Sequence, residues 1–149
     1  MSHQGNDIGT RLIESKSYGA LEVTDNQIYH LELGVIGVSS IHEYALIPLE
    51  DTPFHLLHAL NEDVSFITIP AYETVKDYHF EINDEVVELL QVQNPEEILV
   101  LLIVNIQEDQ LYLNLKAPIL LAPSSRQACQ FIIHDQDLPI RHLLQRKGE

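Results

Sequence analysis

Residues 44–69 read YALIPLEDTPFHLLHALNEDVSFITI, and this stretch decides the fold. Its apolar runs lie at 44–49, 54–60 and 65–69, and the polar segments EDTP and NED separate them. Short apolar runs bounded by turn residues are typical of β-strands that follow one another along the chain. The stretch therefore predicts strand, turn, strand, turn and strand.

The same pattern continues on both sides of this stretch. Before it, strands are predicted at 12–16, 19–23 and 27–33. After it, strands are predicted at 98–106, 111–115, 119–122 and 130–134. Residues 94–97, which begin with Asn94, have the pattern of a helix N-terminus. The residues that follow are rich in β-branched side chains, so one helical turn and then a buried strand are expected. Pro118 and Pro123 mark strand ends.

A single helix is predicted, at 84–91. Asn83 or Asp84 can cap its first turn, and Glu85 is favourably placed there because the N-terminal end of a helix carries partial positive charge. Three apolar residues fall on one face, Val86, Leu89 and Leu90. Many short strands with one helix predict a mainly β fold, a small antiparallel β-barrel or barrel-like sandwich with one short helix, because closing a sheet removes its exposed edges.

The chain has 149 residues, the ordinary size of one domain, and a single domain over 1–149 is predicted. Residues 1–10 are polar and contain glycine, so a flexible leader is expected there. The one cysteine, Cys129, has no evident activating neighbour, which predicts a buried thiol in a reducing compartment. The most apolar run, 98–104, is far shorter than the roughly 20 residues of a membrane-spanning helix. A cytoplasmic protein that does not associate with membranes is therefore expected.

Charge is strongly negative, because 8 Lys and Arg residues face 23 Asp and Glu residues, a net charge of −15. Direct binding of nucleic acid is disfavoured, since phosphate contacts need clustered basic residues. A negative surface instead attracts basic partners. Acidic residues recur at predicted turns, where they are either simply solvated or gathered into a negative rim for such a partner.

Four potential metal ligands or proton carriers lie close together near the C-terminal end: His134, Asp135, Asp137 and His142. A metal-dependent hydrolase built on them is the alternative function. Their spacing is that of a loop, however, and the sequence contains no HExxH pair, GxSxG elbow or phosphate-binding glycine loop. No enzyme and no cofactor are therefore predicted.

Several segments together resemble one protein family. They are LNLKAPI at 113–119, DLPIRH at 137–142, Tyr18-Gly19, the glycine-bracketed loop within 31–38, and the stretch 46–54. On these residues the chain resembles the flagellar assembly factor FliW over 11–144. It departs from the family in the glycine-bracketed loop, where Ile36 and Val38 stand at places that usually hold proline and phenylalanine.

The resemblance implies a bacterial cytoplasmic regulator that acts by binding proteins. The implied partners are flagellin and the CsrA dimer, an RNA-binding repressor of flagellin translation. Binding antagonises CsrA, and unexported flagellin displaces it, so that flagellin synthesis is coupled to filament assembly. The free protein is expected to be a monomer.

Two groups of residues are predicted to contact partners. The first matches the family segments: Asn114, Lys116, Asp137, Arg141 and His142. The second is the acidic surface of the predicted helix: Asp84, Glu85 and Glu88. The first group has structural alternatives: Asn114 and Lys116 can close a turn and cover apolar surface, and Asp137 with Arg141 can form an ion pair that fixes the C-terminal segment.

Overall fold

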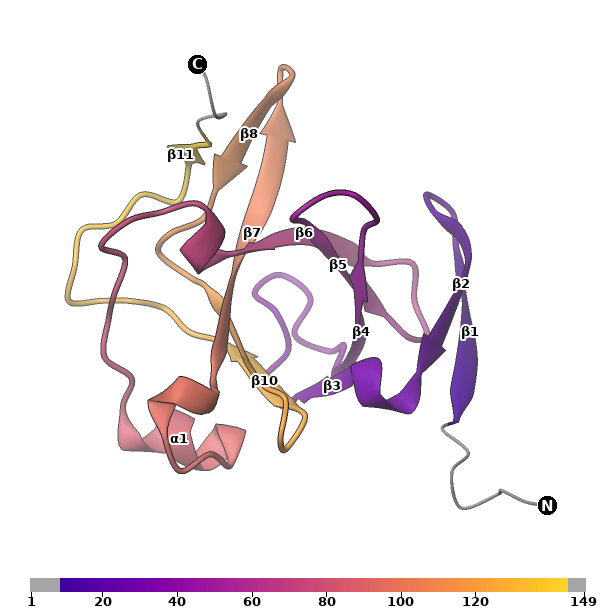
Figure 1. Ribbon diagram of the computed structural model, residues 1–149, viewed down its shortest axis with the longest axis horizontal. Helices are drawn as coiled ribbons and strands as arrows, with labels where there is room; N and C mark the ends of the chain where they lie inside the picture. Colours follow the sequence, from indigo (N-terminus) through magenta and orange to yellow (C-terminus); the bar gives the residue numbers. More distant parts are fainter. Residues whose placement is uncertain (1–8, 145–149) are drawn as a thin grey trace.

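The computed structural model describes residues 9–144. Within this range the chain forms eleven strands, one α-helix and three 3-10 turns (Figure 1). In chain order the strands and the helix are β1 (Thr10–Ser15), β2 (Gly19–Thr24), β3 (Ile28–Leu31), β4 (Glu43–Pro48), β5 (His55–Ala59), β6 (Ser65–Pro70), α1 (Asp84–Leu90), β7 (Leu99–Gln107), β8 (Gln110–Leu113), β9 (Ile119–Ala122), β10 (Gln127–Gln130) and β11 (His142–Leu143). The 3-10 turns are Asp25–Gln27, Ala71–Glu73 and Pro95–Glu97.

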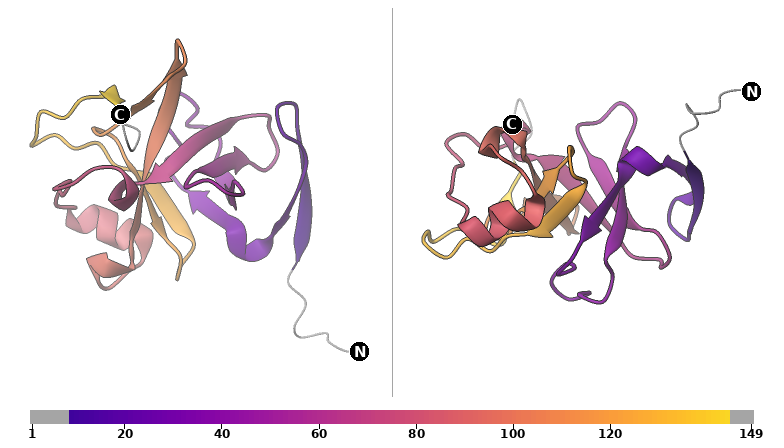
Figure 2. Two further views of the ribbon diagram at one scale, coloured as in Figure 1. Left: turned by 45° about the horizontal axis from the view of Figure 1, so that its top comes forward. Right: turned by 90° about the horizontal axis from the view of Figure 1, so that it is seen from below.

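Seven of the strands close into a barrel (Figure 2). Residues 99–101 of β7 pair with β9, whereas residues 104–107 pair with β8. Because β6, β5, β4, β3 and β10 follow in order from β7, the β7–β9 pairing completes the ring. Strands β8 and β11 branch from the second half of β7, and the β3–β10 pair is parallel while the other pairs are antiparallel. The predicted small barrel with one short helix is confirmed.

Strand β9 is buried on both faces because it separates two apolar clusters. Side chains alternate along a strand, so Ile119 and Leu121 belong to the cluster inside the barrel. Leu120 and Ala122 belong to the cluster beneath α1. Burying a large aliphatic side chain contributes roughly 1.5–3 kcal/mol relative to leaving it exposed. This one strand therefore joins the helix to the barrel.

The predicted helix is confirmed and ends one residue earlier than expected. Asn83 caps it, because its Oδ1 accepts a hydrogen bond from the Val86 amide at 2.9 Å. Gln91 ends it in the left-handed region, with φ of 55°. Leu90 is fully buried in the cluster that faces β9 and β10. Within residues 9–144, no helix is long and apolar enough to cross a membrane.

Strands β1 and β2 form a separate hairpin outside the barrel, at the right of Figure 1. Ile13 and Val23 pack against Ala45 of β4 and are buried there. Thr10 is already paired with Thr24, so the ordered hairpin includes the last residue of the predicted leader. The leader residues 1–8 lie outside the described part of the chain.

The predicted strand at 130–134 is wrong, because the strand ends at Gln130. The Phe131 amide donates to the Pro118 carbonyl at 2.9 Å, and the Ile133 amide donates to the Lys116 carbonyl at 2.8 Å. Apolar residues therefore alternate here as in a strand, but the backbone amides of this segment bond to the turn between β8 and β9 and not to a neighbouring strand. The two-residue strand β11 was not predicted.

Candidate functional site

An apolar groove of about 400 Å³ lies between the glycine-bracketed loop and the C-terminal segment. Its lining residues are Val35, Ile36, Phe66, Ile103, Asn114, Lys116, Ala117, Gln130, Ile132 and Ile140. Three of its isoleucines are exposed: Ile36 at 61 %, Ile132 at 36 % and Ile140 at 56 %. Apolar side chains from separate segments thus gather at one surface, which is the usual character of a protein contact site.

The groove wall that carries Ile36 depends on two glycines. Gly34 has φ of 69°, and a Cβ at this position would lie 2.6 Å from the backbone of Ser39, so the loop requires glycine. Gly37 also has positive φ, at 96°. The Ile36 amide donates to Oε1 of Gln130 at 2.9 Å. These constraints hold Ile36 at the groove.

Asn114 and Lys116, both predicted as contacts, line the groove and also close the turn between β8 and β9. Asn114 Oδ1 accepts hydrogen bonds from the amides of Lys116 and Ala117, each at 3.1 Å. The Lys116 ammonium donates to the carbonyl of Ile133 at 3.1 Å. The turn-closing role is therefore present in the structure, and it fixes one wall of the groove.

The other three family-matched residues do not line the groove. The guanidinium carbon of Arg141 lies 5.1 Å from the centre of the Tyr112 ring, and its Nη2 donates to Oε1 of Gln107. His142 belongs to β11 and pairs with β8. Asp137 is exposed and forms no ion pair with Arg141 among residues 9–144. The ion-pair alternative is therefore wrong, because Arg141 engages a ring and an amide instead.

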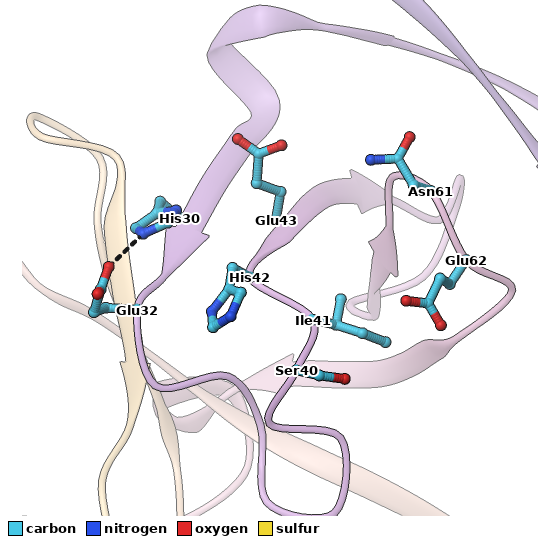
Figure 3. Close-up of a pocket in the computed structure, with 8 residues that line it drawn as sticks. All are labelled: His30, Glu32, Ser40, Ile41, His42, Glu43, Asn61 and Glu62. Carbon is cyan, nitrogen blue, oxygen red and sulfur yellow. Dashed lines mark hydrogen bonds and ion pairs between the residues drawn. The ribbon is translucent and has the colours of Figure 1, made fainter.

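A second hollow, the acidic cavity, has a volume of about 380 Å³ and borders the same loop (Figure 3). Its lining residues are His30, Glu32, Ser40, Ile41, His42, Glu43, Asn61 and Glu62. His30 Nε2 donates to Glu32 Oε1 at 2.7 Å on one side of the cavity. That hydrogen bond, and then the charge of His30, lower the pKa of Glu32. Figure 3 shows Asn61 and Glu62 on the opposite side.

The acidic residues do not collect on one rim. The turns at 50–51 and 62–63 join β5 to β4 and to β6, so they lie at opposite ends of β5. Asp84, Glu85 and Glu88 are exposed on α1 and line neither the groove nor the acidic cavity. The helix therefore carries a separate acidic patch.

The buried thiol of Cys129 and the half-buried phenol of Tyr78 are not arranged for chemistry. Burial raises the pKa of the Cys129 thiol to about 11, and the predicted buried thiol is confirmed. Burial also raises the pKa of Tyr78, whose hydroxyl donates to the Leu115 carbonyl at 2.6 Å. Both groups therefore stay protonated near neutral pH.

The residues of the hydrolase alternative are not assembled into a ligand set. His134, Asp135 and Asp137 are exposed, and His142 lies in the β11–β8 pairing. Within the described part of the chain, no three His, Cys, Asp or Glu side chains lie close enough together to hold a metal ion.

Sequence reasoning missed the exposed isoleucines and the acidic cavity. The available signal for the groove was an isoleucine set among glycines or polar residues, as in GVIG at 34–37 and PIR at 139–141. The cavity has no such local signal. Its residues come together through the pairing of His30 with Glu43 across β3 and β4, and through the turn after β5.

Comparison with known proteins places the chain in a family. The family model described as "FliW protein" matches residues 11–144. Flagellar assembly factors FliW from Caldicellulosiruptor saccharolyticus and Bacillus velezensis are each 30% identical to this chain, over 136 and 137 residues. These alignments cover 89% of this chain and 90% and 96% of the two relatives. The FliW of Clostridium botulinum is 32% identical over 134 residues, covering 87% of this chain and 95% of that protein.

A solved structure agrees with these relatives. The crystal structure of a flagellar assembly factor FliW matches with a TM-score of 0.83 and 26% identity, covering 93% of this chain and 100% of that chain. The family is a non-enzymatic, regulatory one, so the hydrolase alternative gains no support. From the matched residues, the shared barrel and the coverage of nearly the whole described chain, it follows that this protein belongs to the FliW family of flagellar assembly factors.

Proposed function

We propose that this protein is a cytoplasmic regulator that binds and antagonises CsrA, and that alternatively binds flagellin, so that flagellin synthesis is coupled to filament assembly. Family membership supports a role in flagellar assembly. The apolar groove and the strongly negative net charge support a function that depends on contacts with other proteins.

The apolar groove is the observation that carries the proposal. A soluble monomer rarely leaves clustered large apolar side chains exposed unless they contact another molecule. An unassembled subunit of a filament exposes apolar surface that assembly buries. Such a subunit is the kind of partner that Ile36, Ile132 and Ile140 fit, and we assign flagellin to the groove.

The strongly negative net charge favours CsrA as the other partner. An RNA-binding protein presents basic groups for phosphate, and a chain of net charge −15 attracts such a surface. Screening limits this attraction to about 8 Å at physiological salt. Docked carboxylates therefore oppose RNA binding only where they lie close to the RNA path, and the helix patch of Asp84, Glu85 and Glu88 is one candidate contact.

A charge-insertion pair tests the groove. The variant I36E/I140E places two carboxylates at groove residues that are 61 % and 56 % exposed, and L12E/I106E does the same at residues that do not line the groove and are 61 % and 58 % exposed. Titration calorimetry with purified flagellin is expected to show at least about tenfold weaker binding for the groove variant and wild-type affinity for the control. Equal affinities in the two variants would exclude the groove, and no binding by the wild type would reject flagellin as a partner.

A charge-removal pair tests the helix patch. We expect E85Q/E88Q to weaken CsrA binding and to flatten its salt dependence, since two charges that steer association are lost. The variant E22Q/E50Q removes the same charge at exposed residues elsewhere and serves as the control. Calorimetry at two salt concentrations measures both effects. Identical salt slopes for the two variants would remove the helix from the contact surface.

A further inference from the structure

The acidic cavity presents negative charge without a matching cation. Glu32, Glu43 and Glu62 line it, and no Lys or Arg does. Glu32 is paired with His30. Within residues 9–144, Glu43 and Glu62 have no ion-pair partner. The two unpaired carboxylates are therefore available to a positive group from outside the chain.

The histidines of the cavity add acceptors. His42 Nδ1 lies 3.1 Å from the Leu31 carbonyl oxygen, which can only accept, so Nδ1 carries the proton. His30 Nε2 donates to a carboxylate in the same way. In its neutral form each ring keeps its other nitrogen as an acceptor, and the two ring centroids lie 6.2 Å apart in a stacked arrangement. The cavity is therefore suited to a ligand that is rich in donors.

Tyr44 supplies a second and independent observation. Its side chain is fully buried, and its hydroxyl has no hydrogen-bond partner among the described residues. Ile41, which lines the cavity, packs in the same core cluster. Burial raises the pKa of Tyr44 to about 12, and the Glu62 carboxylate adds to the rise. Buried polar groups nearly always have a partner, so this hydroxyl is an unused hydrogen-bonding group in the core cluster that contains Ile41.

The main chain around the cavity is fixed before any ligand binds. The Leu31 amide donates to the His42 carbonyl at 2.7 Å, and the Leu60 amide donates to the Glu43 carbonyl at 3.2 Å. The Ile41 amide donates to the Val38 carbonyl at 3.1 Å. A site that is already formed does not lose affinity to ordering its own backbone.

We propose that the acidic cavity binds one arginine side chain of a basic protein partner, with Glu43 and Glu62 as its ion-pair partners. A guanidinium carries five donors in a planar fork, so it can reach carboxylates and acceptors on different sides of a cavity better than the compact ammonium of lysine can. A cavity of about 380 Å³ has room for one such side chain. The choice of partner rests on the proposed function, because an RNA-binding protein such as CsrA offers basic side chains.

The direct test uses a small probe and needs no partner protein. N-acetyl-arginine methylamide is titrated into ¹⁵N-labelled protein, and N-acetyl-citrulline methylamide serves as the neutral probe of nearly the same shape. We expect saturable shifts of the amide signals of Glu43, Asn61 and Glu62, with at least about fivefold weaker binding of citrulline. Equal binding of the two probes would overturn the proposal.

Variants separate the cavity from general charge. E43Q/E62Q is expected to bind the arginine probe at least about fivefold more weakly, whereas E22Q/E50Q removes the same charge elsewhere and keeps wild-type binding. Unchanged thermal midpoints would show that both variants fold normally. Equal loss in the two variants would overturn the proposal.

Calorimetry with CsrA then tests the partner. A greater loss of affinity in E43Q/E62Q than in E22Q/E50Q is the expected result. Equal affinities would show that CsrA does not use the cavity and would overturn the choice of partner. If the wild type did not bind CsrA at all, the proposed function would fail, and the arginine titration would decide the cavity by itself.

Discussion

The groove and the acidic cavity border the same loop but are built by opposite means. In the groove, polar side chains such as Asn114 and Gln130 hold the backbone, and apolar side chains face outward. In the cavity, the main chain is held by backbone hydrogen bonds, and the polar side chains themselves form the lining. A change in a polar anchor should therefore alter the groove and leave the cavity unchanged, whereas a change in the loop backbone that the two hollows share should alter both.

The largest effect is expected at Gly34, where the loop shared by both hollows begins. Gly34→Ala places a Cβ 2.6 Å from the Ser39 backbone, in addition to requiring positive φ. Strain of this kind costs about 1–3 kcal/mol or more, and both flagellin and arginine binding should weaken. Urea unfolding measures the stability. Gly37→Ala is the matched control, because it carries the positive φ without a neighbour within 4 Å.

The control separates crowding from backbone conformation. Gly37→Ala should lose only the energy of holding an alanine at positive φ, about 1–2 kcal/mol. If both variants lost the same stability, crowding at Ser39 would not be the reason that the loop requires glycine.

A smaller effect, on the groove but not on the acidic cavity, is expected at Asn114. Asn114→Ala leaves the amides of Lys116 and Ala117 without their acceptor, which should cost about 1–3 kcal/mol. Flagellin affinity should fall while arginine binding stays at the wild-type value. Asn105→Ala, on the exposed part of β7, is the control for loss of an amide. Weaker arginine binding in Asn114→Ala would show that the two hollows are not independent.

Gln130→Ala should act more locally still. Its amide oxygen accepts from Ile36, and its Nε2 donates to the Ala117 carbonyl at 3.2 Å. Loss of these bonds should cost about 0.5–1.5 kcal/mol. Hydrogen exchange at the Ile36 amide should become faster, while the Tyr44 amide within the β-sheet should keep its protection. Unchanged exchange at Ile36 would mean that Gln130 does not hold the loop.

The smallest effect is expected at Glu32, whose side chain is exposed. Its pKa is lowered by His30, so the stabilisation from this pair is present above the unfolded pKa and is lost as pH falls through the folded pKa. A carboxyl ¹³C titration should place the Glu32 midpoint below that of an ordinary glutamate. In His30→Ala this midpoint should rise to the ordinary glutamate value. Flagellin affinity should not change in His30→Ala. A midpoint that stays low in the variant would assign the shift to another group.

Local features of the sequence predicted most of the elements. The turn residues around 50–53 and 61–63 bound β5 correctly, and Asn83 caps the helix as expected, because these signals depend on neighbouring residues. Barrel closure was predicted as a class of fold, but the pairing of β7 with both β8 and β9 was not. The β7–β9 pairing, which joins Leu99 to Leu121 and closes the ring, leaves no mark on the local periodicity of either strand.

The candidate site was less predictable than the fold. The turn-closing role of Asn114 was among the alternatives, and the structure contains it. An ion pair of Arg141 with Asp137 was one alternative, but the fold brings Tyr112 and Gln107 to Arg141. The acidic cavity depends on which residues of β3 and β4 stand opposite each other, and this register is set by the whole barrel.

The divided pairing of β7 also has a mechanical consequence. The ladders that β7 makes with β6 and β9 use residues 99–104, whereas β8 reaches only residues 104–107. A pulling force on the arm formed by β8 and β11 would therefore break the β7–β8 hydrogen bonds one after another. The β7–β6 and β7–β9 hydrogen bonds, which close the ring, would remain, so the arm could separate without opening the barrel.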